Sequence, residues 1–444
     1  MRVRSVAAML IACAAASSIA LADGVRFIGA AVIDGTGVDK SGLPSTLLED
    51  GVSPQNGLNG FGSAMAYAGF GNRFVLMPDR GPNKVEYKGG EAVDNTTSYA
   101  NRFQTFDITV KPNADKPTGF SVEAKHLGTT LLKTAKGDQY VGLSTAFAAE
   151  GGNRRLDPEG VRVAPDGSLW VSDEYGPHIL HFDKSGRQIG ALTPPDGFLI
   201  AQPGPNLKGE MAGAKWGRVT NRGAEGLALT PDGRWLVVAM QGALVQDGGA
   251  KALHTRLLVY DLQAQDKPPR QYLYPLKDQQ HSISEILAVD DHRFLVDERD
   301  GKAGAKGSKL LFLIDFNQAQ APTDLATTPY SGREGKALPM EGAPEGVTAL
   351  KKTLFADVGS MLVEAQEKGL GVFVTKEGLP DKMEGYAFGP DLPNGDFLLL
   401  ACNDNDFTTQ ATGLPNYIFA FAVPRDALPG VTLNRLAPGV TFGD

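Results

Sequence analysis

The feature that most constrains the fold of this chain is a repeated unit of two apolar strands joined by a tight turn. In its clearest copy, residues 159–174, alternating apolar residues flank the turn sequence Pro-Asp-Gly, which is a strong signal for a β-hairpin. Similar units lie at residues 225–241, 285–299 and 384–404, and a degenerate one lies at 63–79. Every unit except the degenerate one is followed by a third apolar strand. These strands are residues 179–182, 257–260, 310–314 and 417–421.

Four-stranded units that recur about every 60 residues are typical of β-propeller blades. The 54 Gly and 28 Pro in 444 residues also disfavour a long helical bundle. Residues 344–346, including Glu345, could begin an additional blade, although apolar residues between 350 and 365 recur at helical spacing and favour a short helix. Residues 25–33 could supply a strand that closes the last blade. We predict one all-β domain over residues 23–444, a β-propeller of four-stranded blades with loop insertions, six blades being preferred and five the alternative.

Residues 1–22 have the pattern of a secretory signal peptide. Two arginines precede an apolar stretch over residues 6–21, and Ala-Leu-Ala at 20–22 forms a small-x-small cleavage site. Cleavage after Ala22 predicts a periplasmic or secreted protein, while lipoprotein processing at Cys13 is the alternative. No later apolar run reaches the roughly 18 residues that span a bilayer, so we expect no transmembrane segment.

The charge balance argues against nucleic acid as a partner. The chain has 43 Lys and Arg against 51 Asp and Glu, a formal charge of -8, and an acidic surface repels phosphate backbones. It also contains neither a Gly-x-Ser-x-Gly motif nor a Gly-x-x-x-x-Gly-Lys phosphate loop, which removes support from serine-hydrolase and nucleoside-triphosphatase functions. A small molecule is therefore the expected partner.

Acidic residues recur at the same end of the hairpin units. Residues equidistant from an antiparallel turn lie side by side across the ladder, so we expect pairs such as Glu159 with Asp173. Because the innermost strand of each blade faces the propeller axis, these acids would meet at one mouth of the central channel. The candidate ligands are Glu159, Asp173, Glu174, Glu225, Glu285, Asp297, Glu298, Glu384 and Asp404.

Clustered carboxylates raise one another's pKa unless they are protonated, solvated or bound to a cation. An all-oxygen set of ligands without Cys or His favours Ca²⁺ over zinc. The alternative is that some of the acids cap strands or turns in a wet channel. Guanidinium groups beside calcium would hold a phosphate well, which makes Arg80, Arg102 and Arg299 the candidate substrate-binding residues. Ordinary pairing with carboxylates is the alternative for each arginine.

Several of these motifs resemble those of a known family. They lie at residues 157–160 and 169–174, 223–228, 282–287 and 297–299, and 384–385 and 403–406. In this order they resemble the phytase-like domain family, described by the phrase "esterase-like activity of phytase". The segment 159–182 is also similar to part of the calcium-dependent β-propeller phytases. The resemblance implies a calcium-bearing channel that hydrolyses phosphomonoesters. It places Glu159, Asp173 and Glu174 in the acidic blade motif, and Arg80 and Arg299 at the phosphate.

We therefore expect an exported calcium-dependent hydrolase of phosphate esters, with Glu159, Asp173 and Glu285 as catalytic residues. Its substrate would be a small-molecule phosphate ester or another ester. One alternative is a non-catalytic propeller that binds a ligand or partner and uses calcium structurally. Another is a calcium-dependent hydrolase of carboxylic esters or lactones.

Overall fold

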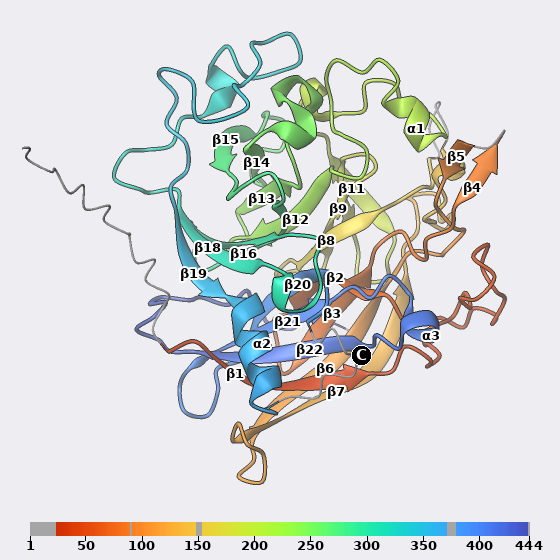
Figure 1. The fold of residues 1–444 in the computed structure, drawn as a ribbon, viewed down its shortest axis with the longest axis vertical. Coiled ribbons are helices and arrows are strands. Elements are labelled where there is room, and N and C mark those ends of the chain that lie inside the picture. Colours follow the sequence, from red (N-terminus) through yellow and green to blue (C-terminus); the bar gives the residue numbers. More distant parts are fainter. Residues whose placement is uncertain (1–23, 89–90, 148–152, 371–378, 443–444) are drawn as a thin grey trace, which may run out of the picture.

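The computed structural model describes residues 24–88, 91–147, 153–370 and 379–442. The strands in these residues form five four-stranded sheets and one two-stranded sheet. The five larger sheets are arranged around a common axis, with β2, β8, β12, β16 and β20 innermost (Figure 1). The chain is thus an all-β propeller of five blades.

The blades are numbered here in chain order, each from its innermost strand outward. Blade 1 contains β2 (Phe61–Tyr67), β3 (Arg73–Pro78), β6 (Arg102–Pro112) and β7 (Phe120–Leu131). Blade 2 contains β8 (Pro158–Val163), β9 (Leu169–Asp173), β10 (Ile179–Phe182) and β11 (Gln188–Leu192). Blade 3 contains β12 (Ala224–Leu229), β13 (Trp235–Met240), β14 (His254–Asp261) and β15 (Arg270–Pro275). Blade 4 contains β16 (Ser282–Ala288), β17 (Arg293–Arg299), β18 (Lys309–Asp315) and β19 (Lys352–Asp357). Blade 5 contains β20 (Met383–Gly389), β21 (Phe397–Asn403), β22 (Asn416–Val423) and β1 (Arg26–Ile33).

The preference for six blades is wrong. The long gap between the last two hairpins holds a loop over residues 316–351 and then β19, which is the fourth strand of blade 4 and not the start of a new sheet. Glu345 lies in that loop and belongs to no strand. The short helix expected nearby is confirmed as α2 (Val358–Glu367), which Asp357 caps by accepting a hydrogen bond from the Ser360 backbone N–H.

The remaining elements lie in the connections between strands. The β4–β5 hairpin (Glu86–Lys88 and Glu91–Asp94) belongs to the insertion after β3. The short helices are α1 (Leu207–Glu210) and α3 (Thr409–Thr412). The single-turn 3₁₀ helices are Ser144–Ala146, Asp196–Phe198, Val245–Asp247, Gly249–Lys251, Gly304–Lys306 and Leu325–Thr327.

The N-terminal strand closes the ring. β1 pairs antiparallel with β22 in a register that runs from Arg26 opposite Ala422 to Ile33 opposite Asn416. This confirms the predicted closing strand. Because β1 and β22 come from opposite ends of the chain, the last blade forms only when both ends are folded.

The hydrophobic core is divided among the spaces between blades. Five clusters of buried apolar side chains each join two adjacent blades, and Trp170 and Ile179 of blade 2 packing with Val238 of blade 3 is one example. Near the axis the innermost strands approach so closely that glycine is required: a Cβ on Gly226 would lie 2.8 Å from the backbone of Glu285. The blades therefore hold one another in register around the channel.

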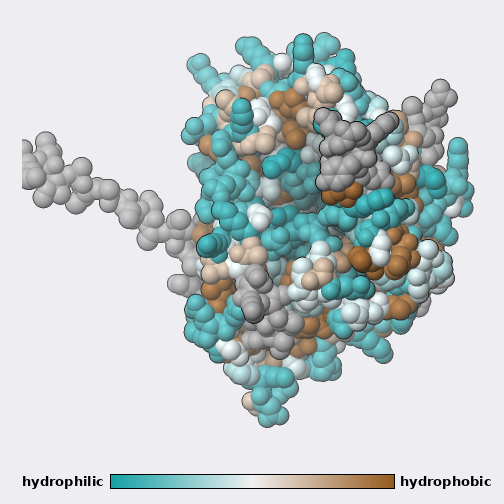
Figure 2. Space-filling model, turned by 45° about the vertical axis from the view of Figure 1, so that its right-hand side comes forward, coloured by the Kyte–Doolittle hydropathy of each residue, from teal (hydrophilic) through white to brown (hydrophobic). Residues whose placement is uncertain are grey.

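One face of the molecule can be described from its surface polarity. The face drawn in Figure 2 is hydrophilic over most of its middle, with smaller hydrophobic areas between. None of the helices among the described residues combines the length and apolar character needed to cross a bilayer.

Candidate functional site

Each blade carries a β-bulge at the same place on its innermost strand. The register between first and second strands shifts between Phe61 and Ala64, Pro158 and Gly160, Ala224 and Leu227, Ile283 and Glu285, and Met383 and Gly385. A bulge adds a residue to one strand and re-aims its side chain. As a result Asp173 pairs with Pro158 and not with Glu159, so the expected side-by-side pair of these two acids does not form.

The bulges create two layers of equivalent positions at one mouth of the channel. The bulge layer, one residue from each blade in order, is Ser63, Glu159, Glu225, Ser284 and Glu384. On the second strand of each blade, one residue pairs with the first strand just before the bulge, and the residue after it belongs to the second layer. This layer consists of Asp79, Glu174, Gln241, Arg299 and Asp404. The layers touch one another: Gln241 Nε2 donates to Glu225 Oε1 at 2.8 Å, and Arg299 Nε donates to Ser284 Oγ at 2.8 Å.

Three overlapping groups of carboxylates result from this arrangement. Within each group one oxygen from every residue lies within 4.8 Å of the others. The groups are Asp79, Asp404 and Asp406; Asp79, Asp157 and Glu159; and Glu159, Glu174 and Glu225. Asp79 and Glu159 each belong to two groups, so the acids form a continuous arc, called the acid arc here, from blade 5 through blades 1 and 2 to blade 3.

The acid arc contains three residues that were not among the ligands predicted from their positions in the hairpin units. Asp79 ends the degenerate first hairpin, Asp157 precedes Glu159 by two residues, and Asp406 follows Asp404 by two residues. The sequence signal for Asp406 is the run Asn-Asp-Asn-Asp at 403–406, a pattern of polar side chains that suits a ligand-bearing loop. Asp79 could be recognised only once the bulges of the five blades were aligned, because its hairpin has Ser63 where the hairpins of blades 2, 3 and 5 have a glutamate.

Asp173 and Glu285 bond to the protein instead of joining the acid arc. The carboxylate of Asp173 accepts hydrogen bonds from the backbone N–H groups of Asp157, Tyr175 and Gly176 at 2.9–3.1 Å, which fixes the loop that carries Glu174. Glu285 forms a buried ion pair with Arg162 at 2.9 Å. Glu285 lies outside the acid arc because Ser284 occupies the bulge in blade 4, which places Glu285 one residue beyond the bulge position.

Three further predicted ligands lie outside the acid arc. Glu298 points to the other side of its strand, where it accepts from the Tyr274 hydroxyl and the Lys277 backbone and pairs with Lys352. Asp297 is buried beside Tyr386, and burial raises its pKa well above the ordinary value. Glu384 occupies its bulge but pairs with Arg299.

The three predicted arginines are all engaged within the protein. Arg80 Nη1 contacts Asp157 at 2.8 Å and Asn221 at 2.7 Å. Arg299 is paired with Glu384, as described above. Arg102 is fully buried, pairs with Asp39 and stacks over the ring of Tyr99 at 4.3 Å.

One arginine at this mouth has no partner among the described residues. Arg222 follows Asn221 and precedes Gly223, whose Cβ, if present, would lie 2.2 Å from the backbone oxygen of Glu174. Its guanidinium lies against Gly242, next to Gln241, so that a Cβ there would be 3.3 Å from Arg222 Nη1. The lack of a hydrogen-bond partner leaves Arg222 available to an anion, and no sequence signal separated it from other surface arginines.

Burial dominates the electrostatics of the acid arc. Burial, with nearby carboxylates as a further cause, raises the pKa of Asp79, Glu159 and Glu225 well above the ordinary values. The same causes, burial first, raise the pKa of Glu174 to about 8 and that of Asp404 to about 7. Ionising all of these acids at once is therefore unfavourable, and a bound cation would lower that cost by stabilising their charged forms.

The side chains present fit a hard cation. The seven acids of the arc and Glu384 make eight carboxylates, while the basic residues that contact them are three, Arg80, Arg299 and Lys382. If all eight were ionised, five negative charges would be left without a basic partner, and divalent cations could offset them. Glu174 Oε1 and Glu225 Oε2 are buried without a hydrogen-bond partner, and oxygen-only ligands suit calcium.

Backbone strain is also concentrated at this mouth. Among the described residues, the non-glycine residues with a left-handed backbone are Asn221, Asp406 and Phe407, with φ of 55°, 52° and 57°. Asn221 binds Arg80, Asp406 belongs to the acid arc, and Phe407 follows it. Such conformations cost energy and persist mainly where surrounding contacts hold them, often at functional sites.

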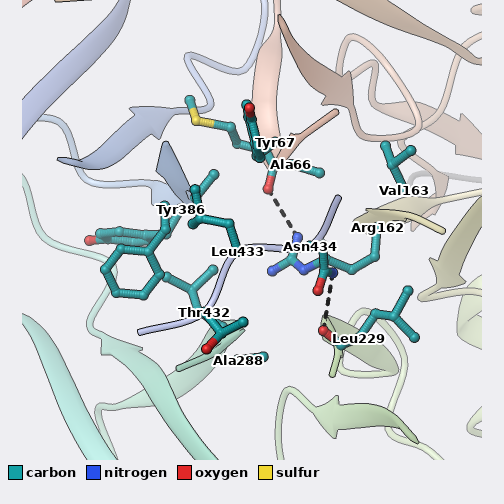
Figure 3. A pocket seen from close by; sticks show the side chains of 14 residues that line it. Ala66, Tyr67, Arg162, Val163, Leu229, Ala288, Tyr386, Thr432, Leu433 and Asn434 are labelled. Atoms are coloured by element: carbon teal, nitrogen blue, oxygen red, sulfur yellow. Dashed lines mark hydrogen bonds between the residues drawn. The ribbon is translucent and has the colours of Figure 1, made fainter. Parts of the chain in front are cut away.

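The opposite end of the channel is small and covered. Residues 432–434 pack across it and line a cavity of about 50 Å³ together with inner-strand residues (Figure 3). Arg162 donates to the backbone oxygen of Met65 at 2.9 Å, and Asn434 donates to that of Leu229 at 3.2 Å. None of these lining residues belongs to the acid arc.

Known proteins similar to this chain fall into two groups. A relative from Arthroderma benhamiae, named "Uncharacterized secreted protein", is 26% identical over 458 residues and covers 81% of this chain and 86% of its own length. Solved structures with a similar outline include a gluconolactonase from Xanthomonas campestris (10% identity, 89% of this chain and 97% of the other, TM-score 0.31). The Swd1 β-propeller domain of Myceliophteria thermophila is another (11% identity, 82% and 97%, TM-score 0.33).

The family comparison covers most of the propeller. The sequence model of the phytase-like family, described as "Esterase-like activity of phytase", matches residues 56–407. This range begins before β2 and ends in the loop that carries Asp406, so it includes the whole acid arc. The chain therefore belongs to the phytase-like family.

Proposed function

We propose that this protein is an exported, calcium-dependent hydrolase of phosphate esters that acts at the acid arc. The observation that carries the proposal is the set of three overlapping carboxylate groups, largely buried at one mouth of the channel. Export is supported by the signal-peptide pattern of residues 1–22 and by the secreted relative. Family membership supports hydrolysis of an ester bond.

The acids of the arc would hold the calcium. Bound calcium would act as a Lewis acid toward a phosphoryl oxygen and lower the pKa of water. Glu159, which like Asp79 belongs to two of the three groups, is the carboxylate that we assign to accept a proton from water in the site. Asp173, through its bonds to backbone N–H groups, positions the loop of Glu174 and so has a structural part in the site.

The basic residues near the acid arc would have two different roles, one toward its carboxylates and one toward the substrate. Arg80 and Lys382 offset carboxylates of the arc and hold them in place. Arg222 has no partner among the described residues and is the guanidinium we assign to the substrate phosphate, since charge-assisted bonds from arginine suit phosphate oxygens. The negative excess of the arc means that phosphate binding would require calcium first.

A hydrolase of carboxylic esters is the second candidate, and the family description, which names an esterase-like activity, favours it. Both candidates are tested with purified residues 23–444 acting on p-nitrophenyl phosphate and p-nitrophenyl acetate, with calcium and with chelator. The test variant is Glu159→Gln with Glu225→Gln. The control is Glu364→Gln, which changes an exposed acid on α2.

Calcium-dependent phosphate release that is lost in the double variant and kept in the control is the expected result. Turnover of the acetate alone would transfer the assignment to the second candidate. If neither ester is cleaved while calcium still raises the melting temperature, the propeller binds a ligand without catalysis and the proposal fails.

A further inference from the structure

A cavity opens directly beside the acid arc. It has a volume of about 350 Å³ and lies between the segment around residues 50–59 and the segment 406–411. Asp406 belongs both to its lining and to the acid arc. Asn83, also in the lining, donates to Asp406 Oδ1 at 3.3 Å and accepts from Arg80 at 3.2 Å. The cavity therefore adjoins the candidate metal site at Asp406.

The walls of the cavity are held by contacts on their outer side. Phe407 packs edge-on against Tyr99, with ring centroids 5.0 Å apart, and these two rings form a small buried cluster with Leu48. Asn405 donates to Asn59 at 2.8 Å and to the backbone oxygen of Leu414 at 2.9 Å. The bond between Asn405 and Asn59 ties the loop before residues 406–411 to the segment around residues 50–59, so the cavity is a formed feature of the fold.

The lining carries negative but no positive charge. Its charged side chains are Asp50 and Asp406, and no Lys, Arg or His occurs among the described lining residues. A smaller cavity of about 230 Å³ on the other side of Asp406 likewise has acidic Asp381 and no basic residue in its described lining. The nearby Lys382 is already paired with Asp404 and Asp406. A second phosphate on the substrate would thus meet carboxylates with no cation to offset it.

The remaining lining suits an uncharged organic group. Val52, Pro54 and Phe407 offer apolar surface, while Thr408 and Gln410 offer hydroxyl and amide groups. Gln410 is exposed and has no hydrogen-bond partner of its side chain among the described residues. This mixture of apolar surface and neutral hydrogen-bonding groups is typical of pockets that bind small neutral ligands.

We propose, building on the phosphate-ester function above, that this cavity receives the organic part of the substrate and selects monoesters whose organic part is uncharged. Phytate and other polyphosphorylated esters are then poor substrates, despite the name of the family. The specificity-determining residues are those on the cavity wall, above all Gln410 and Ala411 of α3.

The test compares kcat/KM of residues 23–444 with calcium for methyl phosphate, glucose 6-phosphate, fructose 1,6-bisphosphate and phytate. We expect glucose 6-phosphate to exceed both polyphosphates at least tenfold. Gln410→Lys, which adds a cation to the wall, should raise kcat/KM for the bisphosphate several-fold. Gln263→Lys is the matched control, since it adds the same charge at an exposed position in the β14–β15 turn.

A steric variant gives an independent measurement. Ala411→Trp should lower kcat/KM for glucose 6-phosphate at least fivefold more than kcat/KM for methyl phosphate, because the larger organic group needs the cavity. Equal or better hydrolysis of the polyphosphates by the unaltered protein would overturn the proposal, as would an Ala411→Trp variant that treats both monoesters alike. Failure to cleave any phosphate ester, methyl phosphate included, would instead overturn the proposed function on which this inference rests.

Discussion

At the residue scale, a one-residue offset decides which acids meet. Glu225 occupies a bulge and belongs to the acid arc, while the corresponding bulge of blade 4 holds Ser284. Glu285, one position further, faces Arg162 instead. Two glutamates with the same place in the sequence repeat therefore have different electrostatic surroundings, one among like charges and one opposite a cation.

This difference predicts opposite effects of the same substitution. Glu285→Gln leaves Arg162 charged and buried without its carboxylate, and should lower the free energy of unfolding by about 3 to 5 kcal/mol without changing the amount of calcium bound. Glu225→Gln removes an ionisable carboxyl group that burial and neighbouring carboxylates disfavour, and should stabilise the calcium-free protein while weakening calcium binding. Denaturant unfolding in chelator and calorimetric calcium titration measure both, and a loss of calcium sites in Glu285→Gln would contradict the assignment.

Arg222 provides a second prediction at this scale. Arg222→Ala should raise KM for p-nitrophenyl phosphate about tenfold or more, because a hydrogen bond to a charged group contributes about 1.5 to 3 kcal/mol. Calcium-dependent stabilisation should be unaffected. Arg435→Ala is the matched control, since Arg435 is exposed beside the segment that covers the opposite end of the channel. An equal change in KM for both variants would show that only the overall charge matters.

At the element scale, the closing strand β1 controls whether the propeller forms. Its seven residue pairs with β22 cover an edge whose neighbours Ile418 and Phe419 are fully buried. Removing the strand would expose both the unpaired edge of β22 and the apolar surface beneath it, and exposed apolar edges favour aggregation.

A truncated protein tests this role. Residues 34–444 should melt at least 10 °C below residues 23–444 and aggregate on heating, because Phe27 and Ile28 are then missing from two of the five core clusters. Thermal unfolding followed by circular dichroism and light scattering makes the comparison. Equal melting temperatures would mean that β1 is dispensable for closure.

At the scale of the whole molecule, the buried acids couple stability to pH and to calcium. In chelator the folded protein holds protons on Glu174, with a pKa of about 8, and on Asp404, with a pKa of about 7, against ordinary values of 4.5 and 3.8. The folded chain thus binds more protons than the unfolded chain across this range. The stability from these protonated carboxyls is complete below about pH 4 and is lost as pH rises through 7 and 8.

The expected result in chelator is a free energy of unfolding that falls between pH 5 and 8, by up to about 1.4 kcal/mol per pH unit for each such carboxyl. Saturating calcium should abolish this slope, because the acids are then ionised in the folded state as well. Guanidinium unfolding at several pH values, with calcium and with chelator, measures the effect. An identical slope under both conditions would show that the acids do not bind the ion.

The sequence by itself determined the all-β class, the repeated hairpins, the closing strand over residues 25–33 and the helix near residue 358, because each follows from local periodicity and turn chemistry. It also indicated that acids such as Glu159, Glu225 and Asp404 lie at one end of their hairpins. The blade count depended on the tertiary structure, since a loop followed by a strand can either begin a sheet or complete one.

The tertiary structure also decided which acids meet and which arginines are free. A bulge slips the register by one residue and reverses the side to which Glu285 points, and periodicity alone does not reveal that slip. Arg102 and Arg80 are neutralised by Asp39 and Asp157, 63 and 77 residues away in the chain. Because charge pairing acts through space and hairpin patterns act along the chain, only the folded protein separated the residues that hold the structure from those left for a ligand.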